Sequence, residues 1–264
     1  MTNTISFPLL NIGPFSISES FSFFGVNIHF YGLIIGIGIV LAYIFAMKTC
    51  KKHNLTQDNV TDILLYGLPS AIVCARLYYV LFKLDEFETF WDIFKIWNGG
   101  IAIYGAIIGA VASTYIYCRV KKINTLSAFD IGAFGLLIGQ ICGRWGNFVN
   151  AEAFGGPTTL PWGMMIHDLS QNMMFHPTFL YESLWNIGVF VVLILYRDKR
   201  KFEGELFFLY ITLYGAGRLW IEGLRTDSLY LGPIRISQLV AILCVIAGIS
   251  IIVYKRNKIK KATQ

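Results

Sequence analysis

Residues Gly143 to Gly156 read GRWGNFVNAEAFGG and follow directly on a long apolar run, residues 128–142. An arginine, two asparagines and a glutamate therefore stand at or near the end of an expected membrane helix. Ionisable side chains are costly there unless they face a protein interior or a wet cavity, so they indicate a functional site. The structural alternative is a helix end packed on small residues, with Arg144 extending to the interface. Four polar groups this close together exceed what anchoring requires.

The polar side chains of this stretch suit an anionic ligand. Arg144 carries a planar fork of donors that fits phosphate or carboxylate. Asn147 and Asn150 lie three residues apart, so on a helix they share a face. Glycines lack side-chain bulk, which lets another backbone or a ligand approach closely. The stretch contains four of them, at Gly143, Gly146, Gly155 and Gly156.

The composition is that of a membrane protein. Of 264 residues, 55% are hydrophobic and 14% are charged, whereas soluble domains carry about 25% charged residues. The net charge of +6 does not indicate a nucleic-acid partner, because the positive charges form short clusters between apolar runs, as in membrane-flanking loops. The five cysteines form no CxxC pair, so we expect neither disulfides nor a metal site.

The apolar runs predict an all-α, polytopic membrane protein. A span needs about 20 residues, and seven runs approach this length, with polar residues interrupting the second and the sixth. We therefore expect about seven transmembrane helices and a single integral membrane domain over residues 1–264. The runs lie near 30–47, 61–83, 99–118, 127–143, 179–196, 205–221 and 236–254.

The basic clusters predict the orientation. They follow the first, third, fifth and seventh helices, within 48–52, 119–122, 197–201 and 255–261. Because positive charge concentrates on the cytoplasmic side, the C-terminus is predicted to be cytoplasmic and the N-terminus outside. Residues 1–28 then form an external arm at the membrane surface. Residues 144–178, with three prolines, form the longest external loop region, and loops of this size are usually functional.

A second candidate site follows the sixth run. Arg218 and Glu222 stand four residues apart and share a helical face, so an ion pair at the helix end is one interpretation. Arg225 then leaves a net positive charge on the outer side, where the positive-inside rule predicts few. An anionic ligand, most simply a phosphate, explains this group of arginines.

Other positions leave two interpretations open. Glu182 follows His176-Pro177 and stands near the positive end of the fifth helix, so it either compensates the helix dipole or orients the arginines. Tyr31 is either an interfacial aromatic residue or a ligand contact. Arg76, deep in the second helix, is expected to pair with Asp62 or Asp130. The glycines around Tyr104 predict close helix packing.

The polar stretch resembles the characteristic motif of prolipoprotein diacylglyceryl transferases, bacterial membrane enzymes that attach a diacylglyceryl group to a lipoprotein cysteine. The matching residues are Arg144-x-Gly146-Asn147-Phe148-x-Asn150-x-Glu152-x-x-Gly155. The likeness covers nearly the whole chain, with the same seven-helix layout and N-terminus outside. Further family motifs occur in order at Tyr31-Gly32, Asn98-Gly99-Gly100, His176-Pro177 with Tyr181-Glu182, and Arg218 with Glu222 and Arg225.

The resemblance implies a transferase in the bacterial cytoplasmic membrane that acts at the extracytoplasmic side without a metal or cofactor. Its substrates would be phosphatidylglycerol, taken from the membrane lipids, and a prolipoprotein signal peptide with a lipobox cysteine. By motif, Arg144 would hold the lipid phosphate and Arg218 would stabilise the leaving group. Asn147, Asn150 and Glu152 would fix the glycerol head and the arginine geometry. The family sites also include Gly155, Tyr31, Glu182, Glu222 and Arg225.

One position departs from the family pattern. Many members have a histidine, assigned as general base, where this chain has Tyr104. Tyrosine, with an ordinary pKa near 10, is a poor base, so we expect Tyr104 to donate a hydrogen bond to phosphate or thiolate. Activation of the thiol is left to Glu152 or to the field of the arginines.

The alternative function is a membrane transporter of an anionic metabolite. A transporter predicts charges near the midplane and a passage to both sides. Here the unexplained charges lie on the expected outer side, which favours the enzyme.

Overall fold

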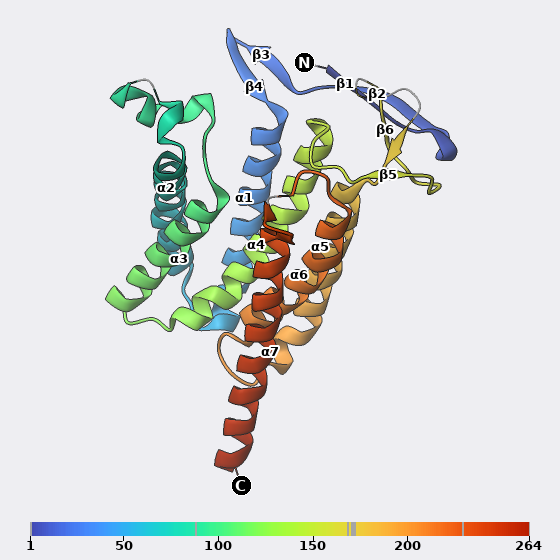
Figure 1. Cartoon of the computed structure of the whole chain (residues 1–264). Helices are drawn as coiled ribbons and strands as arrows, with labels where there is room; N and C mark the ends of the chain where they lie inside the picture. The colour runs from blue at the N-terminus through green and yellow to red at the C-terminus, as the bar shows by residue number, and fades with distance from the viewer. Residues whose placement is uncertain (1, 88, 168, 170–172, 229, 264) are drawn as a thin grey trace. The chain divides into compact units, whose positions relative to one another are not determined.

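The computed structural model describes residues 2–87, 89–167, 169, 173–228 and 230–263. Within this part of the chain, long α-helices form at all seven predicted runs (Figure 1). They are α1 Phe30–Thr49, α2 Gln57–Phe82, α3 Ile103–Val120, α4 Thr125–Val149, α5 Thr178–Tyr196, α6 Glu205–Leu224 and α7 Ile236–Thr263.

The predicted polytopic helical membrane protein is confirmed. Among the described residues, six helices are long and apolar enough to cross a membrane. α6, which carries Glu205, Arg218 and Glu222, is not one of the six. The number of spans and their orientation stay predictions.

Local sequence sets where helices begin and end. At the start of α2, Thr56 Oγ1 accepts a hydrogen bond from the Asn59 amide at 3.1 Å, and Asn59 Oδ1 accepts one from the Thr56 amide at 3.0 Å. This reciprocal cap satisfies two amides that lack an intrahelical partner. α4 continues to Val149, six residues beyond the predicted run. Arg144 and Asn147 are therefore helical residues rather than part of a loop.

The chain divides into two compact units, residues 1–44 with 132–264 and residues 45–131. In the second unit α2 packs closely on α3. A Cβ atom at Gly109 would lie 2.8 Å from Cys74 Cβ, and one at Gly105 would lie 2.8 Å from Ala75 Cα. The predicted close packing at these glycines is confirmed.

Arg76 does not form the predicted pair with Asp62 or Asp130. Its guanidinium donates to backbone carbonyls of the α2–α3 connection, which consists of short 3-10 helices (Leu84–Glu86, Phe90–Phe94 and Ile96–Asn98). Asp62 instead accepts a hydrogen bond from Tyr117 at 2.8 Å. The prediction fails because it considered only carboxylate partners, and carbonyl oxygens also satisfy a buried arginine. The acceptors are Ile93 at 2.7 Å, Asp92 at 2.7 Å, Gly99 at 2.6 Å and Gly100 at 2.8 Å.

Short strands in the first unit add to the predicted helices. The expected arm contains β1 (Thr2–Phe7), the 3-10 turn Pro8–Leu10, β2 (Ile12–Ser18) and a second hairpin of β3 (Ser20–Phe23) with β4 (Val26–His29). An antiparallel sheet has the order β2-β1-β6, with β6 at Met165–Ile166. Two-stranded pairs join β5 (Pro157–Thr158) to β7 (Met174–Phe175) and β8 (Tyr230–Leu231) to β9 (Ile234–Arg235).

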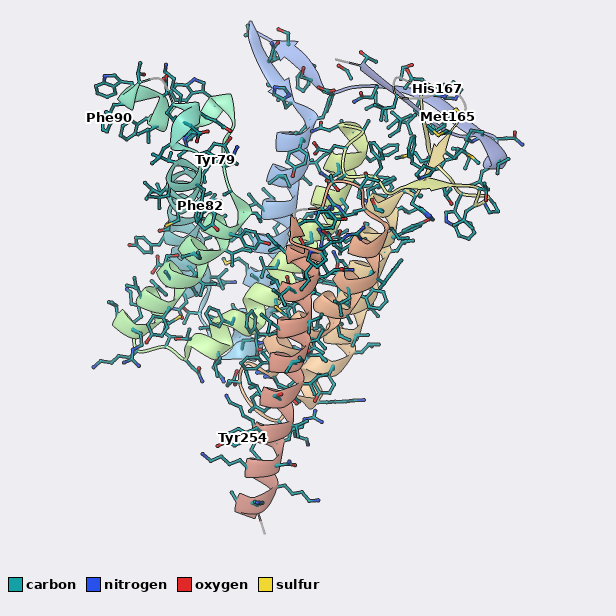
Figure 2. The ribbon with its side chains drawn as sticks, in the orientation of Figure 1. Tyr79, Phe82, Phe90, Met165, His167 and Tyr254 are labelled. Atoms are coloured by element: carbon teal, nitrogen blue, oxygen red, sulfur yellow. The ribbon has the colours of Figure 1, made fainter. Side chains whose placement is uncertain are left out.

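A small apolar core fastens the arm to the helix ends. Ile5, Ile166 and Phe179 are buried together, and Phe148 of α4 packs against them. Asn3 also donates from Nδ2 to the Val149 carbonyl at 3.1 Å, which satisfies one of the free carbonyls at the end of α4. Directly after β6, His167 Nε2 lies 2.8 Å from Ser6 Oγ of β1; Figure 2 labels His167 and Met165 of β6.

Candidate active site

Glu182, in the second turn of α5, joins the two predicted arginines. Its side chain is 3% exposed. Arg218 of α6 donates from Nη1 to Oε2 of Glu182 at 2.8 Å, and Nε of Arg144 of α4 lies 3.5 Å from Oε1. Two interpretations of Glu182 were open, compensation of the helix dipole and orientation of the arginines. These contacts with Arg144 and Arg218 favour the second. Three helices meet at one carboxylate.

Arg218 bridges a second buried carboxylate. Its Nη2 atom lies 2.5 Å from Oε2 of Glu222, one turn further along α6, and that side chain is 1% exposed. The i, i+4 pair predicted from the sequence is confirmed. Arg144, Arg218, Glu182 and Glu222 together are electrically neutral, which is how the buried charges are tolerated.

The prediction that Arg225 leaves a net positive charge is wrong, because Asp227 neutralises it. Arg225 forms two parallel hydrogen bonds with Asp227, from Nε to Oδ1 at 2.9 Å and from Nη2 to Oδ2 at 2.7 Å. These bonds from Arg225 lower the pKa of the Asp227 carboxyl below its ordinary value. The sequence argument paired only residues on one helical face, whereas Asp227 lies in the loop after α6.

Arg144 differs from Arg218 in how much of its donor capacity is used. Arg144 Nε is buried and has no hydrogen-bond partner among the described residues. The contact with Glu182 at 3.5 Å is an ion pair without hydrogen-bond geometry. The side chain is 23% exposed. A guanidinium held this loosely keeps its fork of donors for a planar or tetrahedral anion.

The two predicted asparagines converge on Glu152. Asn147 donates from Nδ2 to Oε1 at 2.8 Å, and Asn150 lies 3.4 Å from the same oxygen. Ala151 and Ala153, on either side of Glu152, have φ angles of 50° and 56°. Alanine adopts this left-handed conformation at a cost of about 1 kcal/mol or more each. The strained turn holds an exposed carboxylate just after the end of α4, the helix that carries Arg144 and Asn147.

Gly155 is a crossing point of three segments. It bridges to Arg225, and its amide donates to the His176 carbonyl at 2.9 Å. A Cβ atom here would lie 2.6 Å from His176 Cβ and 2.9 Å from the Leu224 carbonyl oxygen. Gly155 thus brings the strained turn against the end of α6 by lacking a side chain.

Tyr31 packs on α4 beside the candidate site. A Cβ atom at Gly146 would lie 2.5 Å from Cδ2 of the Tyr31 ring. The ring therefore covers α4 at Gly146, the residue before Asn147. The sequence predicted that another group would approach closely at Gly146, and that group is the aromatic ring of Tyr31. Whether the hydroxyl contacts a ligand stays a prediction.

Tyr104 belongs to the second unit, where its ring centroid lies 6.4 Å from that of Tyr78. The other predicted site residues belong to the first unit. The role of Tyr104 stays a prediction.

Several neighbours of the cluster were not predicted. Tyr214, one turn before Arg218 on α6, places its hydroxyl 3.5 Å from Oε1 of Glu182; its i, i+4 spacing to Arg218 was the signal available in the sequence. Arg235 donates to the Glu222 carbonyl. Trp162 donates from Nε1 to the Tyr181 hydroxyl at 2.7 Å, a pairing that no sequence pattern indicates.

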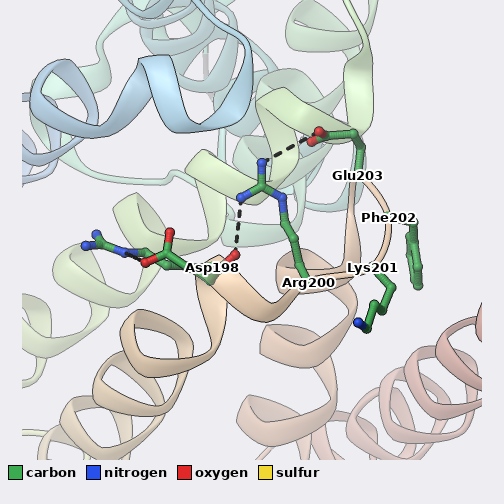
Figure 3. A pocket seen from close by; sticks show the side chains of 6 residues that line it. Asp198, Arg200, Lys201, Phe202 and Glu203 are labelled. Carbon is green, nitrogen blue, oxygen red and sulfur yellow. Dashed lines mark hydrogen bonds and ion pairs between the residues drawn. The ribbon is translucent and has the colours of Figure 1, made fainter.

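Other kinds of site lie outside the arginine cluster or are not formed by the described residues. Within the described ranges there is no group of three or more His, Cys, Asp or Glu side chains that could hold a metal ion. A pocket of about 500 Å³ lies in the α5–α6 connection, between Arg197 and Glu203 (Figure 3). Since α5 rises about 1.5 Å per residue, this pocket is roughly 20 Å along the helix from Glu182. It is therefore separate from the arginine cluster.

Comparison with known proteins identifies the family. A family model described as prolipoprotein diacylglyceryl transferase matches residues 18–254. A phosphatidylglycerol–prolipoprotein diacylglyceryl transferase from Clostridioides difficile is 44% identical over 242 residues, which is 90% of this chain and 96% of that protein. The proteins of the same name from Finegoldia magna and Lysinibacillus sphaericus are 45% and 43% identical, over 91% and 96% of this chain and 97% and 96% of their own length. The chain therefore belongs to the prolipoprotein diacylglyceryl transferase family.

Proposed function

We propose that this protein transfers the diacylglyceryl group of phosphatidylglycerol to the thiol of a lipobox cysteine in a prolipoprotein. A thioether forms as the carbon–oxygen bond to the phosphate breaks, and glycerol phosphate leaves. The reaction takes place in the bacterial cell membrane, at its extracytoplasmic side. The names of the relatives, phosphatidylglycerol–prolipoprotein diacylglyceryl transferase, support both substrates.

The observation that carries the proposal is the unequal use of the two arginines. Arg218 is fixed between two carboxylates, whereas the one ion pair of Arg144 among the described residues is the 3.5 Å contact with Glu182, and its side chain is partly exposed. Displacement at an sp³ carbon builds negative charge on the departing phosphate, and donors fixed in advance stabilise that charge without reorganising. Arg144 binds the phosphate, and Arg218 stabilises the leaving group from a fixed position.

The remaining residues position the reactants. Asn147, Asn150 and Glu152 form a polar wall beside Arg144 that suits the hydroxyls of the glycerol head. Either Glu152 accepts the thiol proton, or the arginines stabilise the thiolate and lower the pKa of the thiol.

A transporter of an anionic metabolite is less well supported. Arg144, Glu182 and Arg218 lie near the end of α4, the start of α5 and the end of α6. Because consecutive helices of a bundle run in opposite directions, these positions share one end. A transport pathway instead concentrates its charges at the middle of the helices.

The direct test is to incubate the purified protein with phosphatidylglycerol and a lipobox peptide and to analyse the peptide by mass spectrometry. The proposal predicts a diacylglyceryl adduct on the cysteine. No adduct is expected on the matched Cys→Ser peptide, because the thiolate is the nucleophile. Absence of the adduct on the cysteine peptide would reject the function, and uptake of a soluble anion into vesicles would favour the transporter.

A further inference from the structure

An apolar groove in the first unit lies outside the arginine cluster. Its volume is about 720 Å³, and Ser16 is its one hydroxyl-bearing residue. Its walls come from the N-terminal hairpin, from the end of α4, from the start of α5 and from Trp162. The lining residues are Phe7, Leu10, Ile12, Pro14, Phe15, Ser16, Ile17, Trp145, Phe148, Trp162, Phe179 and Leu180.

The groove follows the edge of β2. Residues 14–17 of this strand all line it, although successive strand residues point to opposite faces of a sheet. The groove therefore extends along four consecutive residues of β2. β2 is the outer strand of the β2-β1-β6 sheet, and six of its seven residues are exposed. An outer strand presents backbone N–H and C=O groups that can pair with another chain.

We propose that this groove binds the peptide substrate as an extended strand added to β2, with apolar residues near the acceptor cysteine filling the groove. The inference rests on the proposed function and assigns the peptide subsite. An acyl chain would fill the same apolar space, but it cannot pair with the edge of a strand. An extended peptide uses both features, since strand addition takes affinity from backbone bonds and specificity from side-chain pockets.

The position of the groove fits this role. Trp145 lines it and is adjacent in the chain to Arg144, while Phe179 stands three residues before Glu182. Neighbouring helix residues point about 100° apart, so the groove flanks the arginines rather than surrounding them. A peptide there leaves the arginine cluster free for the lipid phosphate. Figure 2 labels Met165 of β6, the strand that pairs with β1 of the hairpin.

The first test separates the two substrates kinetically. Phe15→Ser should raise KM for the peptide about tenfold and leave KM for phosphatidylglycerol unchanged. Phe24→Ser is the matched control, because Phe24 is 92% exposed in the same arm and does not line the groove. A rise in KM for the lipid instead would assign the groove to an acyl chain and overturn the proposal.

The second test addresses the strand edge. Peptides carrying a single N-methyl group at successive positions beside the cysteine should show KM values that alternate between high and normal. Only every second amide of an added strand faces β2. KM values with no period of two would reject strand addition, even if the adduct forms and the proposed function stands.

Binding can also be read without turnover. Benzoylphenylalanine in place of Phe15 should crosslink to the peptide on illumination, whereas the same probe in place of Phe24 should not. Crosslinking of the Phe15 probe to lipid alone would overturn the subsite whether or not the transfer reaction is observed.

Discussion

Arg218 donates from Nη1 to Oε2 of Glu182 over 2.8 Å and so joins α6 to α5 inside the first unit. The two residues are 36 positions apart in the chain. Arg144 of α4 approaches the other oxygen of the same carboxylate, so one buried glutamate orients both family arginines. Its negative charge offsets the repulsion between the two guanidinium groups.

Glu182→Ala is expected to be the most destabilising substitution in the cluster. It leaves two arginines facing each other, and breaking a buried ion pair costs about 3–5 kcal/mol. Glu182→Gln, which keeps the shape and one acceptor, should cost less while still lowering transfer activity. Thermal unfolding in detergent measures both, with Glu203→Ala as control, because its pair with Arg200 is long at 3.6 Å. Equal unfolding temperatures for Glu182→Ala and the control would contradict the role of Glu182.

Adjacent glycines provide a second matched comparison. Gly155→Ala is expected to abolish transfer and lower the unfolding temperature, because its Cβ atom would lie 2.6 Å from His176 Cβ and 2.9 Å from a backbone oxygen. Gly156→Ala should be nearly silent, since no neighbouring atom lies within 4 Å of its Cβ position. Transfer assays of the two variants test this prediction. An equal loss of transfer activity in both variants would refute the crossing of segments at Gly155.

The sequence predicted the helices because apolar length alone specifies a span. It also predicted the polar residues of the cluster, because buried charges near helix ends are rare. The pairing of Arg144 and Arg218 with Glu182 was only one of two interpretations left open by the sequence, since contacts between helices depend on packing that no local pattern encodes. The partner of Arg225 was missed because Asp227 lies in a loop, where helical spacing gives no guidance.

The strands of the arm were missed for a related reason. β1 pairs with β6, more than 150 residues away in the chain, and residues 2–18 show no strict alternation of apolar and polar residues. The carbonyl acceptors of Arg76 could not be predicted either. Every residue has a backbone carbonyl, so no residue type identifies the ones that accept a hydrogen bond. These features depend on the folded backbone.

Acid is expected to weaken the Arg225–Asp227 pair. The pKa of Asp227 is lowered by hydrogen bonds from Arg225, so its contribution to stability is complete above the unfolded value near 3.9 and is lost as the pH falls through the lower folded value. The unfolding temperature of the unmodified protein should therefore fall as the pH is lowered below about 4. That of Asp227→Asn should fall less over the same pH range. An unchanged acid dependence in the variant would show that the pair does not contribute.

Arg76 is expected to hold the α2–α3 connection in place. Its four short hydrogen bonds reach carbonyls from residue 92 to residue 100, and bonds to a charged donor contribute about 1.5–3 kcal/mol each. Arg76→Ala should increase hydrogen exchange of amides within 84–101, at the end of the second unit where Figure 2 labels Phe90. Lys83→Ala, which removes an exposed pair with Glu86, is the control. Equal exchange in the two variants would refute the clamp.

The central claim is that Arg144 binds the lipid phosphate while Arg218 and Glu182 hold the site in shape. The most direct measurement is the amount of diacylglyceryl adduct that purified Arg144→Ala forms on a lipobox peptide, by mass spectrometry, beside the unmodified protein. We predict that the adduct falls at least a thousandfold while membrane insertion stays intact. Adduct formation at the full rate by a correctly inserted Arg144→Ala protein would contradict the claim.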